Sequence, residues 1–259
     1  MKVVILAGGL GSRLGNLTNE IPKPMVEIGG KPILWHLMKY YSCFGFNEFI
    51  LALGYKSNII KDYFINYTYY NSDFSINTNS NTVKILNNSY EDWEVNLVDT
   101  GENTMTGGRI KRLQKLLKNE KTFMLTYGDG LSTIDIKKLV EFHNKEKKII
   151  TVSAVHPVAR FGEIIVKNNT VINFQEKPQS SKGYINGGFF VCNNEIFNYI
   201  SGDDCVFENK PLENLSKENE LAAFTHKGFW HCLDTPRDKK FLDELCTSND
   251  MPWKIWRDV

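Results

Sequence analysis

The chain opens with a short apolar segment that leads directly into a run of glycines. Residues 2–7 (KVVILA) are rich in β-branched side chains, and Gly8 and Gly9 follow at once. A nearly continuous apolar run of this length is typical of a strand buried on both faces, as in a parallel sheet. We therefore expect an α/β fold in which a glycine loop follows the first strand.

The segments after this loop alternate between helical and strand patterns. Residues 32–41 place apolar side chains at helical spacing, with Pro32 suited to the first turn. Residues 49–53 form a second apolar run, and residues 57–67 a second amphipathic segment. This order of strand, loop, helix, strand and helix is the opening of a doubly wound sheet.

The rest of the chain continues the pattern with one interruption. Residues 71–92 are rich in Asn, Ser and Thr, which predicts an excursion of loop or edge hairpin outside the core. No repeat or linker divides the chain, so we expect one domain over 1–259, in which 160–259 form the C-terminal part. Further strands are predicted at 96–99, 122–127, 149–155, 163–166, 171–175 and 188–192, and helices at 107–117, 134–144 and 236–245.

Composition excludes several classes of function. The 31 basic and 30 acidic residues give a net charge of +1, which argues against a broad surface for nucleic acid or membrane. The five cysteines are odd in number and form no CxxC pair, so neither a disulfide framework nor a zinc cluster is indicated. The opening apolar run is too short for a signal peptide, and no stretch approaches a membrane span. We expect a cytoplasmic protein that holds any anionic ligand in a local site.

The glycine loop is the first candidate binding segment. Gly8, Gly9 and Gly11 let the backbone approach a ligand and direct N–H groups toward phosphate oxygens. No Gly-Lys-Ser/Thr ends the loop, and Leu14 stands where a dinucleotide fingerprint needs its third glycine. Arg13 could grip a triphosphate. The alternative is an ordinary tight turn with a solvated arginine.

A lysine between two prolines is the second candidate. Pro22 and Pro24 restrict the backbone on both sides of Lys23. Its ammonium is a compact charge, suited to a phosphorus centre where negative charge builds. A rigid surface loop is the alternative, but the glycine loop ten residues upstream favours a binding role.

Two aspartates are candidate magnesium ligands. Asp129 lies between Gly128 and Gly130 after a buried strand, at the sheet edge where ligands of open α/β folds bind. A turn aspartate is the alternative. Asp234 would supply a second carboxylate, although its place before a helix favours, on composition alone, a role as helix N-cap.

A fourth candidate segment could contact a phosphorylated sugar. Glu176 could accept hydrogen bonds from sugar hydroxyls, and Lys177 could pair with a monophosphate if Pro178 ends the strand there. Ordinary alternation on a half-exposed strand is equally compatible with these residues. The five histidines share no metal-ligand spacing, and we assign them structural or surface roles.

Together these segments resemble the sugar-phosphate nucleotidyltransferase family, and within it the branch that transfers cytidylyl groups. The likeness extends over essentially the whole chain. It is carried by LAGGLGSRL (6–14), PKPMVEIGGKPILWH (22–36), LVDTG (97–101), TMTGGRIKR (104–112), TYGDG (126–130), FQEKP (174–178), INGGFF (185–190), GFW (228–230), LDTPRDK (233–239) and MPWKIW (251–256).

The resemblance implies a Rossmann-like, mixed but mostly parallel sheet flanked by helices, with a small inserted lobe. It implies a magnesium-dependent enzyme that transfers CMP from CTP to α-D-glucose 1-phosphate and releases pyrophosphate. The product, CDP-glucose, would serve bacterial surface polysaccharides such as O-antigen. A homo-oligomer, in this family a hexamer, is also implied.

The resemblance also assigns roles to single residues. Asp129 and Asp234 match magnesium ligands, which overrules the N-cap interpretation of Asp234. Catalytic roles fall to Arg13, Lys23, Asp129 and Lys177. Nucleotide contacts are implied for Leu6, Ala7, Gly8, Gly9, Leu10, Gly11, Ser12, Arg13, Lys23, Thr104, Arg109 and Gly128. Sugar-phosphate contacts are implied for Glu176, Lys177, Asn186 and Gly187.

Small departures leave the acceptor less certain than the chemistry. Ser12 stands where Thr is usual, Ala159 where Gly is common, and Pro236 is unusual. The alternatives are transfer to a different phosphorylated acceptor or from another nucleotide, and a non-catalytic homologue that only binds sugar nucleotides. A nicotinamide dehydrogenase is disfavoured by the missing third glycine.

Overall fold

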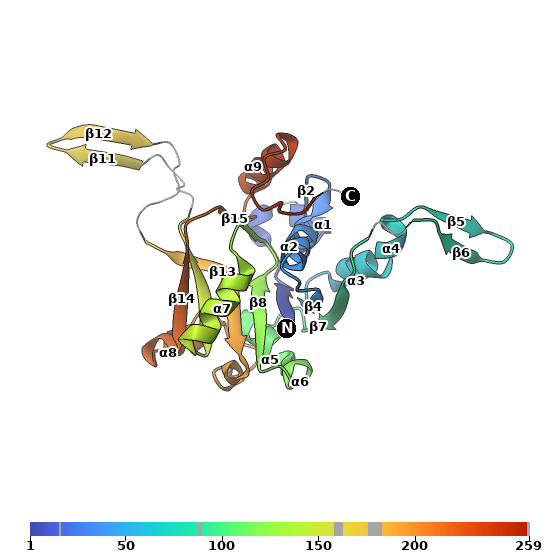
Figure 1. Ribbon diagram of the computed structural model, residues 1–259, viewed down its shortest axis with the longest axis horizontal. Coiled ribbons are helices and arrows are strands. Elements are labelled where there is room, and N and C mark those ends of the chain that lie inside the picture. The colour runs from blue at the N-terminus through green and yellow to red at the C-terminus, as the bar shows by residue number, and fades with distance from the viewer. Residues whose placement is uncertain (16, 88–89, 158–162, 176–182, 258–259) are drawn as a thin grey trace.

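The protein is built on one seven-stranded sheet (Figure 1). The computed structural model describes residues 1–15, 17–87, 90–157, 163–175 and 183–257. The strand order across the sheet is β14 (Leu221–His226), β10 (Ile150–Val155), β13 (Ile185–Asn193), β8 (Thr122–Tyr127), β1 (Val3–Ala7), β4 (Glu48–Leu53) and β7 (Glu94–Asp99).

Strand direction decides which residues share an edge of the sheet. β1 pairs in parallel with β4 and β8, β4 with β7, and β10 with β14. Only β13 runs antiparallel to its two neighbours in this sheet, β8 and β10. The first residues of β13 therefore lie at the same edge as the last residues of β1 and β8. The predicted mixed, mostly parallel sheet is confirmed.

Helices cover both faces of this sheet. They are α1 (Leu17–Glu20), α2 (Ile33–Ser42), α3 (Ser57–Ile65), α4 (Tyr67–Tyr70), α5 (Thr106–Arg112), α6 (Gln114–Leu117), α7 (Ile136–Glu146), α8 (Lys210–Lys217) and α9 (Pro236–Thr247). Three 3₁₀ turns are η1 (Ser12–Leu14), η2 (Lys23–Met25) and η3 (Asn194–Asn198). The predicted segments 57–67 and 107–117 each divide into two short helices, α3 with α4 and α5 with α6.

Alternate residues of each central strand enter two separate cores. Val3 and Ile5 of β1 pack in a cluster with side chains of α2, α3 and α7. Val4, between them, packs in a second cluster with side chains of α5, α6 and α8. The apolar run at residues 2–7 thus forms a strand buried on both faces, as predicted.

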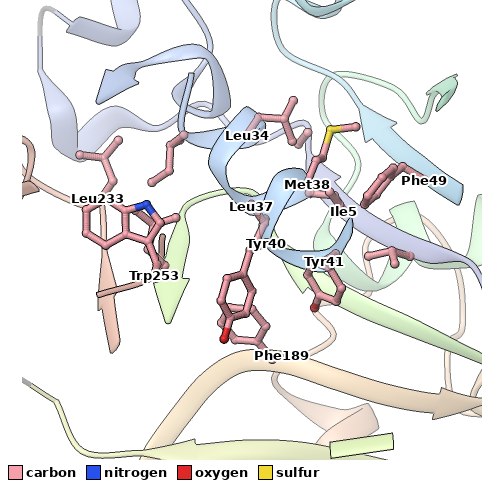
Figure 2. Close-up of a cluster of buried hydrophobic side chains, with 14 of the residues drawn as sticks. Ile5, Leu34, Leu37, Met38, Tyr40, Tyr41, Phe49, Phe189, Leu233 and Trp253 are labelled. Atoms are coloured by element: carbon pink, nitrogen blue, oxygen red, sulfur yellow. The ribbon is translucent and has the colours of Figure 1, made fainter. Parts of the chain in front are cut away.

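The C-terminal segment closes one end of the first core. Trp253 is fully buried, and Figure 2 shows its indole with Leu233 near one end of α2. The indole N–H donates to Nδ1 of His36 at 3.3 Å, while Nε2 of His36 lies 2.8 Å from the Ile28 carbonyl oxygen. Because a carbonyl only accepts, His36 is the neutral tautomer with its proton on Nε2.

Two hairpins project from the body (Figure 1). The predicted excursion contains β5 (Phe74–Asn77) and β6 (Thr82–Ile85), which pair only with each other. Nearly all of their residues are exposed, so this segment lies outside both cores as expected. The second hairpin pairs β11 (Glu163–Lys167) with β12 (Thr170–Gln175), the two strands predicted at 163–166 and 171–175.

Several elements were missing from the sequence prediction. β14 is an edge strand with no fully buried residue, and α8 buries only Pro211 and Leu215, so neither carries a strong apolar pattern. Two further short pairs join β9 (Gly130–Ser132) to β15 (Trp230–Cys232) and β2 (Glu27–Ile28) to β3 (Lys31–Pro32). Strands of two or three residues are below what periodicity can detect.

The predicted cysteine chemistry agrees with the structure. All five cysteines are free thiols, and Cys192 is buried in the second core. Within the described part of the chain, helices long and apolar enough to span a bilayer are absent.

Burial of His36 makes stability depend on pH. Burial lowers its pKa from 6.5 to about 4. The unfolded chain therefore takes up the proton first, so the folded state loses stability as the pH falls from 6.5 toward 4. This side chain should account for about 2 kcal/mol of lost stability between pH 7 and pH 5.

The His36→Gln variant keeps one donor and one acceptor but does not titrate. Between pH 7 and pH 5, the free energy of unfolding measured with urea should fall by about 2 kcal/mol less in this variant than in wild type. Identical pH dependence in the two proteins would contradict the assignment of a buried neutral histidine.

Candidate functional site

A cavity of about 540 Å³ lies at the sheet edge formed by the ends of β1 and β8 and the start of β13. Its walls come from segments that are far apart in the sequence. Predicted site residues that line it are Leu6, Ala7, Gly8, Gly9, Gly11, Ser12, Arg13, Lys23, Thr104, Arg109, Gly128, Asp129, Asn186, Gly187 and Asp234. Leu10 is not in this lining, and its side chain is 58% exposed. Its nucleotide contact stays a prediction.

Lys23 connects the two predicted magnesium ligands. Its ammonium lies 2.5 Å from Oδ2 of Asp129 and 2.6 Å from Oδ1 of Asp234. Arg13 adds a third ionic contact, with Nη1 2.8 Å from Oδ2 of Asp234. The side chain of Lys23 is largely buried, whereas that of Arg13 is exposed. We call Arg13, Lys23, Asp129 and Asp234 the charge cluster.

Short backbone pairings bring the two carboxylates together. β9 begins at Gly130, directly after Asp129, and pairs with β15, which ends two residues before Asp234. The Leu233 N–H donates to the Asp129 carbonyl at 2.9 Å. A ladder of three residue pairs thus places Asp234 beside Asp129 although 105 positions separate them in the sequence.

The N-cap interpretation of Asp234 from composition alone is wrong. α9 is capped by Thr235, whose side chain accepts from the Asp238 N–H, while the Asp238 carboxylate accepts from the Thr235 N–H at 2.7 Å. Pro236 occupies the first turn, where its missing N–H costs nothing. This reciprocal capping box leaves the Asp234 carboxylate free to face Lys23 and Arg13.

The ionic contacts of the charge cluster shift the pKa values of Asp234 and Lys23. Burial alone would raise the pKa of Asp234, but hydrogen bonds and charge from Lys23 and Arg13 outweigh it and lower that pKa. Burial alone would lower the pKa of Lys23, but the charges and hydrogen bonds of Asp129 and Asp234 outweigh this effect and raise that pKa. Both shifts keep the carboxylate and the ammonium ionised near neutral pH.

The carboxylates suit a divalent cation. Asp129 and Asp234 already converge on one positive charge, the Lys23 ammonium, so a cation fits between them. Magnesium characteristically takes one or two protein carboxylates and completes its shell with substrate phosphates and water. Groups of three or more potential metal ligands are absent from the described residues, which is compatible with a site completed by a substrate.

Arg109 makes its guanidinium hydrogen bonds within the protein, to four backbone carbonyls and one hydroxyl. It is buried, and its guanidinium donates to the carbonyls of Gly8, Leu53, Gly101 and Glu102 and to the Thr100 hydroxyl, at 2.7–3.0 Å. Burial lowers its pKa from the ordinary arginine value. The guanidinium therefore holds the glycine loop against the ends of β4 and β7. Its predicted contact with the nucleotide stays a prediction.

Gly8 is required by this arrangement. A Cβ at this position would overlap the Arg109 guanidinium and lie 2.9 Å from the Gly54 nitrogen. At Gly9 nothing lies within 4 Å of such an atom. The two glycines thus have different roles, since the first admits the arginine and the second faces open space.

The predicted sugar contacts Asn186 and Gly187 line the cavity from β13, two strands away from β1. Asn186 and Gly187 open β13, and the Trp230 indole N–H donates to the Gly187 carbonyl at 2.7 Å. Asn186 is exposed, and its Nδ2 donates to the Tyr127 hydroxyl at 3.2 Å. Glu176 and Lys177 lie outside the described residues, so their sugar-phosphate role stays a prediction.

Sequence reasoning missed other residues that line or support the cavity. Tyr127 and Trp230 stood inside quoted motifs but received no role, and Thr106 lines the cavity beside Thr104. Glu208 belongs to no motif, and its contacts with Tyr127 and Thr106 arise only from the fold.

A comparison with protein families shows to which family this chain belongs. A sequence model described as nucleotidyl transferase matches residues 2–259. The chain belongs to the nucleotidyl transferase family. A glucose-1-phosphate cytidylyltransferase of Salmonella typhimurium is 47% identical over 256 residues, which cover 99% of this chain and 100% of the relative. A probable glucose-1-phosphate cytidylyltransferase of Bacillus subtilis is 42% identical over 257 residues, with coverage of 99% and 100%.

Solved structures agree with this nucleotidyltransferase fold. HddC from Yersinia pseudotuberculosis, complexed with GMP-PN, superimposes with a TM-score of 0.68 and 30% identity over 94% of this chain and 98% of that chain. UDP-glucose pyrophosphorylase complexed with UDP-glucose gives the same TM-score at 18% identity, over 96% and 98%, which concerns the fold alone. The predicted family and Rossmann-like fold are confirmed.

Gly8 and Gly9 provide a matched pair for testing the loop of this nucleotidyltransferase. Gly8→Ala should destabilise the protein by about 2 kcal/mol or more, because the new methyl displaces a buried guanidinium. Gly9→Ala should change stability by less than about 0.5 kcal/mol. Urea unfolding measures both, and equal losses in the two variants would contradict the proposed packing.

Lys23 should compete with a divalent cation for Asp129 and Asp234. Lys23→Met removes the ammonium, so the nucleotide-free variant should bind Mn²⁺ about tenfold more tightly than wild type. Electron paramagnetic resonance of free Mn²⁺ measures this affinity directly. Lys138→Met, on the exposed face of α7, is the control, and a Lys23→Met affinity equal to that of the control would refute the competition.

Proposed function

We infer that this nucleotidyltransferase transfers CMP from CTP to α-D-glucose 1-phosphate and yields CDP-glucose and pyrophosphate. The observation that carries the inference is 47% identity over the full length of a named glucose-1-phosphate cytidylyltransferase. The cavity supports it, since the glycine loop and the charge cluster line it together with Asn186 and Gly187 of β13.

The reaction needs no nucleophile from the protein. A phosphate oxygen of the sugar 1-phosphate forms the new bond to the α-phosphorus of CTP. The bond from this phosphorus to the oxygen that bridges to the β-phosphate breaks, and pyrophosphate leaves with the electron pair. Because the attacking phosphate is already ionised near neutral pH, no proton has to be removed from it. Catalysis then consists of positioning and charge stabilisation.

The charge cluster supplies the electrostatic part. We propose that Lys23 turns from the carboxylates toward the triphosphate when the nucleotide enters, and that Arg13 follows from its exposed position. Magnesium held by Asp129 and Asp234, when bound, supplies positive charge for the phosphates on both sides of the breaking bond. The two carboxylates would then have magnesium as their positive partner in place of the Lys23 ammonium.

The remaining residues would orient the two substrates. The glycine loop, braced by Arg109, presents backbone N–H groups to the triphosphate. Asn186 and Gly187 would contact the sugar, and Glu176 with Lys177 the sugar hydroxyls and phosphate. The positive charge of Lys177 would offset repulsion between the two anionic substrates.

Two other interpretations remain distinguishable by experiment. The enzyme could use a different phosphorylated acceptor or another nucleoside triphosphate, since relatives named for guanylyl transfer are 31% identical over 250 residues. A non-catalytic homologue that binds sugar nucleotides is disfavoured, because the ion pairs keep Arg13, Lys23, Asp129 and Asp234 at one cavity.

We also propose a cytoplasmic homo-oligomer, a hexamer in line with the family resemblance. The free thiols support a reducing compartment. Light scattering coupled to size exclusion measures the oligomeric state, and the 29.8 kDa mass of the chain sets the scale.

A substrate matrix tests the proposed function. Four nucleoside triphosphates are combined with several sugar 1-phosphates, and pyrophosphate release is measured with magnesium present. We expect CTP with glucose 1-phosphate to give the highest kcat/KM. Asp129→Asn should lower that value at least about 100-fold, since it removes one negative ligand from the cation site.

Asp62→Asn, which changes an exposed carboxylate on α3, is the matched control and should retain wild-type rates. Highest activity with another pair of substrates would overturn the substrate assignment. Binding of CDP-glucose without turnover of any pair would favour the non-catalytic homologue.

A further inference from the structure

Glu208 is a carboxylate that lies outside the charge cluster. It lies in the turn that precedes α8 and is partly buried. Its Oε1 accepts from the Tyr127 hydroxyl at 2.6 Å, and its Oε2 accepts from the Thr106 hydroxyl at 2.6 Å. Both hydroxyl-bearing residues line the cavity, so one carboxylate fixes two parts of its wall.

The hydrogen bond to Glu208 sets the direction of the Tyr127 hydroxyl. Because the Tyr127 O–H donates to this carboxylate, the phenol oxygen presents a lone pair to its other neighbour, Nδ2 of Asn186, at 3.2 Å. Burial and the nearby carboxylate raise the pKa of Tyr127, so it remains a donor at neutral pH. Glu208 therefore makes the Tyr127 oxygen an acceptor for Asn186.

The ring of Tyr127 is held equally firmly. Gly188 has a φ of +80°, and a Cβ there would lie 2.6 Å from Cδ2 of the ring. The ring also meets Phe190 edge to face, with centroids 5.8 Å apart. The hydroxyl therefore has a fixed position as well as a fixed direction.

Asn186 is the end of this chain of contacts. Its Nδ2 donates to Tyr127, and its Oδ1 accepts from the Gly188 N–H at 2.8 Å. An amide can be turned over with little change in shape, and here the two partners allow only one orientation. The exposed amide keeps one further N–H and one further lone pair for a ligand in the cavity.

The other oxygen of Glu208, Oε2, contacts Thr106 at the start of α5. The Thr106 hydroxyl donates to Glu208 and accepts from the Phe207 N–H at 2.9 Å. Thr106 begins α5, the helix that carries Arg109. Through Thr106 the carboxylate is anchored to a rigid element, so its position does not depend on the ligand.

We propose that Glu208 is a positioning residue for the acceptor sugar, which acts through Tyr127 to orient the Asn186 amide toward a sugar hydroxyl. The proposal rests on the proposed function, in which Asn186 contacts the sugar. It distinguishes the acceptor from the nucleotide, because β8 separates Asn186 at the start of β13 from the glycine loop that follows β1.

Steady-state kinetics of Glu208→Met and Tyr127→Phe test the proposal. Each change leaves the size of the side chain nearly intact, but Glu208→Met removes both acceptor oxygens and Tyr127→Phe removes the hydroxyl that Asn186 contacts. We expect the KM for the sugar 1-phosphate to rise about five- to tenfold, as for a lost hydrogen bond, while the KM for the nucleotide changes less than about twofold. The double variant should resemble Tyr127→Phe alone, because both changes break one chain of contacts.

Tyr199→Phe provides the matched control. It removes a tyrosine–glutamate hydrogen bond of equal length, from Tyr199 to Glu218 at 2.6 Å, on the exposed surface. Both KM values should stay at the wild-type level. Circular dichroism at rising temperature shows whether the variants fold like the parent protein.

Affinity for products gives a second measurement that does not depend on turnover. In calorimetry Glu208→Met should weaken binding of CDP-glucose about five- to tenfold and leave binding of CDP unchanged. Equal weakening of both ligands, or a rise in both KM values together, would overturn the positioning role.

The two proposals fail in different ways. A wild-type protein that turns over another sugar phosphate refutes the proposed acceptor, and the same KM comparison is then made with that acceptor. A wild-type protein that favours glucose 1-phosphate, together with a Glu208→Met variant of unchanged KM, refutes the role of Glu208 alone.

Discussion

The contact of one ammonium with two carboxylates organises this molecule. Asp129 and Asp234 repel each other unless a cation lies between them, and Lys23 supplies that cation at 2.5 and 2.6 Å. The surrounding structure serves to hold three separate segments at this point. Two prolines stiffen the lysine loop, the β9–β15 ladder aligns the aspartates, and a capping box keeps α9 from using Asp234.

The direction of one strand explains how two substrates meet there. In a purely parallel sheet the start of β13 would lie at the far edge, away from the glycine loop. Because β13 runs antiparallel to β8 and β10, Asn186 and Gly187 lie at the edge where β1 and β8 end. The residues proposed for the nucleotide and for the acceptor thus share one edge of the sheet because of strand order and direction.

Local patterns predicted some of this and could not predict the rest. A buried strand before Asp129 was enough to place that carboxylate at the ligand edge, and the core strands followed from their apolar runs. Asp234 needed the family resemblance, because composition cannot tell which of two adjacent residues caps a helix. The commitment of Arg109 to five oxygens and the contacts of Glu208 depend on tertiary neighbours that no local pattern encodes.

The distances along the chain have a consequence for biosynthesis. Asp234 lies 211 positions beyond Lys23, and Trp253 lies 217 positions beyond His36. Contacts of such high sequence separation form late, since a long loop must close before they contribute. On the ribosome the first strands can emerge and collapse well before either partner exists. A nascent chain therefore carries a glycine loop without the complete charge cluster, which can form only after Asp234 has been synthesised.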